Sequence, residues 1–153
     1  MNIHDLCDYI IFKVIAGDES LDNLKLQKLM YYCQAWHAAF FGERLVDAEF
    51  QAWVHGPVNR EIFDRFRDTK SLYSLVSMDD IREQFDPNRL DESEKLHVDK
   101  VLNAYARFSG AQLEQMTHRE TPWIEAREGY SPAARCEVPI KLETMESFYK
   151  ARL

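Results

Sequence analysis

The feature that most constrains the fold is the long, nearly apolar stretch Leu24–Phe41. Its apolar residues recur at the three- and four-residue spacing of a helix: Leu26, Leu29, Met30, Cys33, Trp36 and Phe40. After Met30 the stretch is apolar almost all round, which is typical of a helix that is buried on every side. Asp22 or Asn23 can cap its start, and Gly42 can end it. The sequence therefore predicts a central helix around which the remaining chain packs.

Several further helices are indicated by periodicity and by capping residues. Apolar residues recur at helical spacing in segments 3–15, 58–66, 92–108 and 140–153. Ser109 with Gln112 forms a capping box before another helix. Thr121-Pro122 is typical of a helix start in which the threonine caps and the proline occupies the first turn. The pattern predicts a mainly α fold.

A short extended element is expected among these helices. Alternation of apolar and polar residues up to Val54 permits a strand, so we expect a small β-hairpin or an extended segment near residues 44–54. Gly56-Pro57 predicts a turn that leads directly into a helix, with Pro57 near its first position. Because no linker or repeat divides the 153 residues, we expect one compact domain spanning residues 1–153.

Charge and hydropathy narrow the classes of function. The chain carries a net charge of −7, and residues 79–99 alone hold eight acidic side chains against three basic ones. Such a chain repels phosphate backbones, so nucleic-acid binding is disfavoured, whereas a basic partner would be attracted. The acidic stretch can equally be a solvated surface that aids solubility. No run approaches the ~20 apolar residues of a membrane span, and Asp5 and Asp8 interrupt any signal peptide, so a cytoplasmic protein is predicted.

Chemistry-bearing motifs are sparse. Three cysteines at irregular spacing form neither a disulfide framework nor a zinc pattern. His118-Arg119-Glu120 has the His-x-Glu form of zinc deaminases, but the second cysteine of their downstream motif is missing. Cys33 and His37 could share one helix face, although a packed cysteine is the simpler interpretation. We expect no catalytic residues, no bound metal and no cofactor. An enzyme built around His37, His55 or His118 stays as an alternative.

One polar cluster at the start of the central helix is less easily explained. Lysine is disfavoured in a first helical turn, because the helix dipole is already positive there. Lys25 and Lys28 therefore suggest a partner carboxylate, either within the chain, such as Glu61 or Asp64, or in another protein. The candidate partner-binding residues are Lys25, Gln27, Lys28, Tyr31, Tyr32, Trp53 and His55. If these prove internally satisfied, the acidic stretch of residues 79–99 is the next candidate.

The sequence resembles the Panacea domain of SocA-like antitoxins in three blocks. The first is Leu24-Lys25-Leu26-Gln27-Lys28-Leu29-Met30-Tyr31-Tyr32, continuing to Trp36, and the second is Ala52-Trp53-Val54-His55-Gly56-Pro57-Val58. A weaker third block runs from Leu113 through Thr117-His118 to Pro122-Trp123. The blocks span roughly residues 21–128, and the first two together are fairly specific.

The resemblance implies a phage-associated antitoxin that neutralises a cognate protein toxin by direct binding. It also leaves open an adaptor role, in which the domain delivers a toxin or another client to a cytoplasmic protease. The family supplies no catalytic residues, which agrees with the sparse chemistry of the sequence. We therefore expect a protein partner, with neither nucleic acid nor membrane involved.

Overall fold

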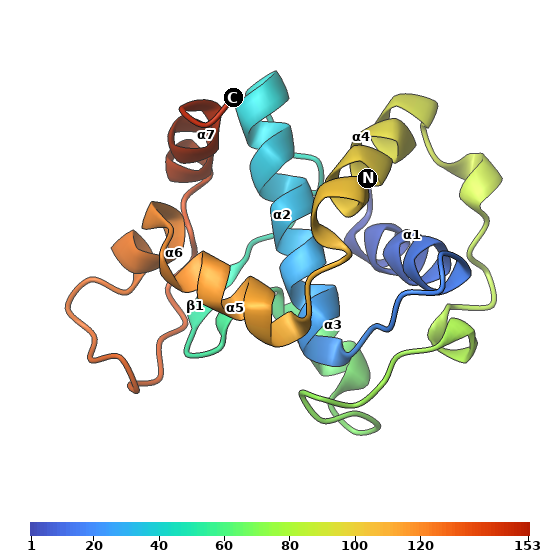
Figure 1. Cartoon of the computed structure of the whole chain (residues 1–153), viewed down its shortest axis with the longest axis horizontal. Helices are drawn as coiled ribbons and strands as arrows, with labels where there is room; N and C mark the ends of the chain where they lie inside the picture. The colour runs from blue at the N-terminus through green and yellow to red at the C-terminus, as the bar shows by residue number, and fades with distance from the viewer.

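The computed structural model describes residues 1–153 and is mainly α-helical, as the sequence predicts (Figure 1). The helices are α1 (Ile3–Ala16), α2 (Asn23–Phe41), α3 (Arg60–Phe66), α4 (Glu92–Tyr105), α5 (Gly110–His118), α6 (Thr121–Ala126) and α7 (Leu142–Lys150). Strands β1 (Gln51–Trp53) and β2 (Gly56–Val58) form one small sheet, and η1 (Met78–Asp80) and η2 (Pro87–Arg89) are single turns of 3₁₀ helix.

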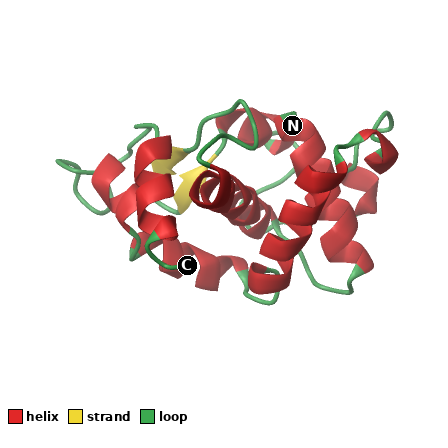
Figure 2. Cartoon of the chain, turned by 90° about the horizontal axis from the view of Figure 1, so that it is seen from above, coloured by secondary structure: helices red, strands yellow, loops and turns green.

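Helix α2 is the central element of the fold. Sixteen of its nineteen residues are buried, so it is enclosed on nearly every side. Figure 2 shows it almost along its axis, with the other helices around it, and it contacts α1, α4, α5 and α7. The Asp22 side chain accepts a hydrogen bond from the Lys25 backbone N–H at 2.7 Å, and Gly42 ends the helix in the left-handed conformation. Both predicted ends of the central helix are therefore confirmed.

Strand β1 lies within the expected residues 44–54, whereas β2 lies just beyond them, and Pro57 belongs to this second strand. Residues 51–53 pair with 56–58 in antiparallel register, with Ala52 opposite Pro57. The prediction that Pro57 opens the next helix is wrong, because Asn59 caps α3 by accepting from the Ile62 N–H at 3.0 Å. Proline has no N–H to donate, and its carbonyl is bound by a side chain from α2 instead.

Helix α5 begins with the predicted cap, whereas helix α6 does not. The capping box of Ser109 and Gln112 is present at the start of α5. At α6 the capping position is Glu120, and Thr121 is the first helical residue, so the predicted threonine cap is wrong. The Glu120 side chain turns inward to accept hydrogen bonds from two tyrosines instead of capping its own helix.

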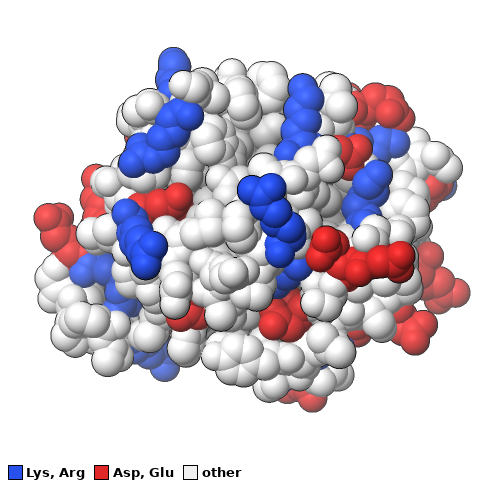
Figure 3. Space-filling view, in the orientation of Figure 1, with Lys and Arg blue, Asp and Glu red and all other residues white.

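The segment between α3 and α4 is anchored to α1 by ion pairs. The fully buried Asp8 carboxylate accepts hydrogen bonds from Arg65 at 2.5 Å and from Arg82 at 2.6 Å. Arg82 also bonds Asp5 at 2.6 Å. A large group of acidic side chains nevertheless gathers on the surface where α1, α4 and this segment lie (Figure 3). No helix combines the length and the apolar character needed to cross a bilayer.

Candidate functional site

The seven predicted partner-binding residues fall into two groups. The α2 side chains Lys25, Gln27, Lys28, Tyr31 and Tyr32 are at most 4 % exposed, whereas Trp53 is half-buried and His55 is exposed on the hairpin. The buried five contact other parts of this chain, so a partner could reach them only if the core opened. Trp53 and His55 are accessible as the structure stands.

The lysines and the glutamine of α2 hold neighbouring backbone in place. Lys25 Nζ donates to the Ser20 carbonyl at 2.9 Å, and Lys28 Nζ donates to the Pro57 carbonyl at 3.0 Å. Gln27 exchanges two hydrogen bonds with the backbone of Asn59, at 2.8 and 3.1 Å. The carboxylates predicted as partners within the chain, Glu61 and Asp64, are therefore wrong, and backbone carbonyls take their place. Gln27 and Lys28 pin the hairpin and the start of α3 to the central helix.

Lys28 lies in an unusual electrostatic environment. Complete burial lowers the pKa of its ammonium group from 10.5 to about 7, and the charge of Glu114 only partly offsets this. The hairpin leaves no spare room around it, because a Cβ on Gly56 would lie 2.5 Å from Lys28 Cε. Gly56 also has a φ of 100°, which favours glycine on its own account.

The two α2 tyrosines belong to a buried polar cluster with Glu120. The Glu120 carboxylate accepts from Tyr32 Oη at 2.7 Å and from Tyr149 Oη at 2.8 Å, while Tyr31 Oη lies 3.1 Å from Tyr149 Oη. Burial raises the pKa of Glu120 and those of the three phenols. These contacts join α2, α6 and α7, so the tyrosine pair of the first sequence block serves packing.

The accessible residues of the hairpin line the largest groove of the molecule. This groove of about 580 Å³ lies between the first half of α2, the hairpin, α3 and the loop segments 70–72 and 133–137. Trp53 forms one wall with Phe63 of α3, their ring centroids being 4.8 Å apart and their planes inclined by 65°. A cleft of this size with an apolar wall and a few polar groups is typical of a binding site.

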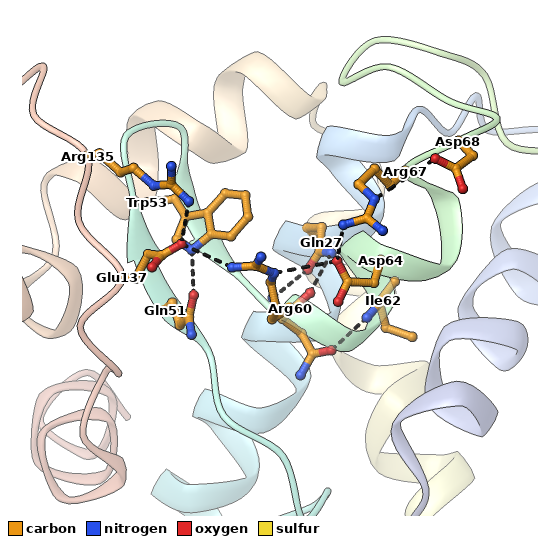
Figure 4. A network of polar contacts seen from close by, with 11 residues as sticks. Gln27, Gln51, Trp53, Arg60, Ile62, Asp64, Arg67, Asp68, Arg135 and Glu137 are labelled. Atoms are coloured by element: carbon orange, nitrogen blue, oxygen red, sulfur yellow. Dashed lines mark hydrogen bonds and ion pairs between the residues drawn. The ribbon is translucent and has the colours of Figure 1, made fainter.

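Charged side chains surround this apolar wall (Figure 4). Arg60 Nη1 lies 3.0 Å from Glu137 Oε1 and its Nε 3.5 Å from Asp64 Oδ1, and the Arg60 guanidinium carbon lies 5.8 Å from the Trp53 ring centroid. Arg67 shares Asp64 at 3.5 Å, and Arg135 shares Glu137 at 2.9 Å. Basic side chains on α3 and on the 133–137 loop therefore stand above an aromatic wall.

The histidines and cysteines do not assemble a reactive centre at this groove. His55 pairs with Glu114 at 3.3 Å, but His118 stacks on Trp123 at 4.1 Å and His37 packs against His97. No three His, Cys, Asp or Glu side chains converge as metal ligands would. Burial raises the pKa of the Cys7 thiol to about 12 and also raises the pKa of the Cys33 thiol, which disfavours the thiolate that a nucleophile requires.

Sequence reasoning found the hairpin side of the groove and missed the rest. Arg60 and Phe63 on α3 and Arg67 at its end recur at helical spacing, a pattern that indicates only an ordinary amphipathic helix. Arg135 and Glu137 lie in a loop whose position no local pattern could give. The spacing that places two arginines beside an aromatic residue on one helix face is the one sequence signal that could have pointed to this surface.

Comparison with known proteins places the chain in a family. Residues 26–124 match the family described as antitoxin SocA-like, Panacea domain. A curated relative, antitoxin SocA of Caulobacter vibrioides (strain NA1000 / CB15N), is 28% identical over 125 residues, which cover 77% of this chain and 66% of the relative. No solved structure matches. The chain belongs to the SocA-like Panacea-domain family, as its sequence blocks indicate.

The matched region contains most of the groove. It includes nearly all of α2, the whole hairpin and α3, whereas the loop residues 133–137 lie beyond its end. The α2 and hairpin blocks that carry the family resemblance are adjacent in space. Their contact is the buried set of hydrogen bonds from Gln27 and Lys28 to the hairpin end.

Proposed function

We propose that this protein is an antitoxin that neutralises a protein toxin by direct binding, and that the groove beside Trp53 is the contact surface. Membership of the SocA-like family supports the antitoxin role. The observation that carries the choice of surface is the half-buried Trp53–Phe63 pair, which lines the largest groove and is flanked by exposed arginines. Tryptophan and arginine are the residues most enriched at the energetic centres of protein interfaces.

A binding role fits the chemistry of the chain better than a catalytic one. The thiols of Cys7 and Cys33 are held in their protonated form, and the histidines are either packed against aromatic rings or paired singly with a carboxylate. Binding by a preformed groove needs neither a nucleophile nor a general base. The polar side chains of the family blocks then serve to fix the shape of the groove wall.

Co-expression with the product of the adjacent gene tests this function. The expected result is rescue of growth and a complex that survives gel filtration. Trp53→Ala should abolish both, because truncation of a central aromatic typically costs an interface at least tenfold in affinity. Phe12→Ala, which truncates an exposed aromatic on α1, is the matched control and should rescue as wild type does. No rescue and no complex with the unaltered chain would refute the proposal.

A protease adaptor is the second candidate, and a second exposed surface favours it. Phe40, Phe41 and Leu153 are 55–68 % exposed, and Phe40 and Leu153 line one shallow apolar cavity. This cavity lies near the carboxyl end of α2, about 24 Å along the helix from Leu24 at the groove. Two separated surfaces would let one chain hold a client and a protease together. The half-life of the client, measured with and without the cytoplasmic proteases of the host, distinguishes adaptor from direct neutraliser.

A further inference from the structure

The groove concentrates positive charge in an acidic protein. Apart from the fully buried Lys28, its lining contains four basic side chains and one acidic one: Arg60, Arg67, Lys70, Arg135 and Glu137. Outside this set of five the chain has 15 basic residues against 25 acidic ones. The net charge of the groove lining is therefore opposite in sign to that of the rest of the chain, and it attracts an anionic ligand.

The positive charges stand next to an apolar wall. Arg60 extends over the Trp53 ring, and Phe63 continues this wall toward Leu72 and Val58. A ligand that satisfied only the guanidinium groups would leave this apolar surface in contact with water. The occupant that fits best carries both negative charge and an apolar side chain, because apolar burial and ion pairing then act together.

The present partners of the arginines can be exchanged. Arg60 and Arg67 pair with Asp64, and Arg60 and Arg135 with Glu137, at separations of 2.9–3.5 Å. The side chains in these pairs are 41–82 % exposed. Exposed ion pairs contribute little to stability, so a carboxylate on a bound segment can replace Asp64 or Glu137 at small cost. The arginines of the groove can consequently bind an anionic ligand, because their present ion pairs hold them only weakly.

An unpaired acceptor remains among the groove residues. Asn23 is 8 % exposed, and its Nδ2 donates to the Ser71 carbonyl at 3.4 Å, but its buried Oδ1 has no hydrogen-bond partner. Buried acceptors are normally satisfied in folded proteins. A bound segment can donate to this buried oxygen only if the neighbouring Ser71 loop moves aside.

We propose that the groove binds an extended acidic segment of the protein partner, with an apolar side chain packed against Trp53 and Phe63 and with carboxylates paired to Arg60 and Arg67. This inference rests on the proposed function and specifies the chemistry of the segment recognised. A nucleic acid is the weaker occupant, because Asp64 and Asp68 stand beside Arg67 and the chain as a whole is strongly acidic.

Selection from a random dodecapeptide display library tests the proposal without knowledge of the partner. Against the immobilised 153-residue chain, the enriched pool should be more acidic than the input and should contain apolar residues between the acids. The double variant Arg60→Glu/Arg67→Glu should weaken the best peptide more than tenfold, and raised salt should weaken it further. Arg89→Glu on η2, where the side chain is 84 % exposed, is the charge-reversal control and should change affinity less than twofold.

The outcomes separate this inference from the proposed function. A neutral or basic pool, no enrichment over the double variant, or competition of the best peptide by a single-stranded oligonucleotide would each overturn the acidic-segment proposal. If the double variant still neutralises the co-expressed toxin, the antitoxin function stands while this inference fails. If acidic peptides bind and no toxin is neutralised, the groove chemistry stands while the proposed function fails. Circular dichroism of both variants confirms that they are folded.

Discussion

Lys28 should make the stability of this protein rise with pH between neutral and mildly alkaline conditions. The lysine is fully buried, and its pKa is about 7 in the folded protein against 10.5 in the unfolded chain. When the chain folds, the ammonium group must therefore either lose its hydration while still charged or release its proton. A difference of this size corresponds to about 5 kcal/mol. The free energy of unfolding is lowered by this full amount below pH 7. The reduction disappears as the pH passes 10.5, where the unfolded chain also loses the proton.

The rise is large enough to measure in a narrow window. At pH 7 the unfolded chain binds about half a proton more at this site than the folded protein does, and by pH 8.5 the difference is almost one proton. The linkage relation then gives an increase of about 1.5 kcal/mol in the free energy of unfolding. Above pH 8.5 the effect of buried thiols runs the other way, because the pKa of Cys7 is raised to about 12 and only the unfolded chain ionises easily. The window therefore ends there.

Urea denaturation followed by tryptophan fluorescence at pH 7.0, 7.5, 8.0 and 8.5 measures this slope. Lys28→Met should flatten it by about 1 kcal/mol per pH unit. The absolute stability of this variant is less informative, since methionine removes the buried charge but also leaves the Pro57 carbonyl without its donor. Lys100→Met, at an exposed position on α4, is the control and should keep the wild-type slope. A Lys28→Met slope equal to that of wild type would refute the reasoning.

Three further substitutions probe the packing that shapes the site. Asp8→Asn should lower the free energy of unfolding by about 3 kcal/mol in a urea titration, because it breaks the pairing of a buried carboxylate with two arginines. Asp5→Asn, which alters a carboxylate that is one-third exposed, should lower it by less than about 1 kcal/mol. Gly56→Ala should lower the free energy of unfolding by about 2 kcal/mol more than Gly129→Ala does. Both glycines have positive φ, but only a Cβ at Gly56 would meet a neighbouring atom, Lys28 Cε at 2.5 Å. Equal melting temperatures of the two variants would contradict this steric argument. Glu120→Ala removes the acceptor of two buried tyrosine hydroxyls and should cost about 2 kcal/mol by thermal denaturation, and an unchanged melting temperature would show that water replaces it.

Local sequence signals were sufficient for most of the helices. The periodic apolar residues of α2, its Asp22 cap and its glycine stop all act within a turn or two of the chain, so they can be recognised without tertiary knowledge. The same holds for the capping box at Ser109. The predictions failed where a distant residue overrode local preference. Pro57 became part of a strand, and Glu120 left its capping position for tyrosines of α2 and α7.

What the sequence determined by itself was the central helix, the mainly α fold and the family, since these depend on neighbouring residues and on the spacing of the sequence blocks. Only the tertiary structure decided that Lys28 faces a carbonyl and that Trp53 faces a groove. The groove joins residues from Asn23 to Glu137, and its charge depends on which arginines end up on the same surface. Such convergence is a property of packing between distant segments, which no local pattern encodes.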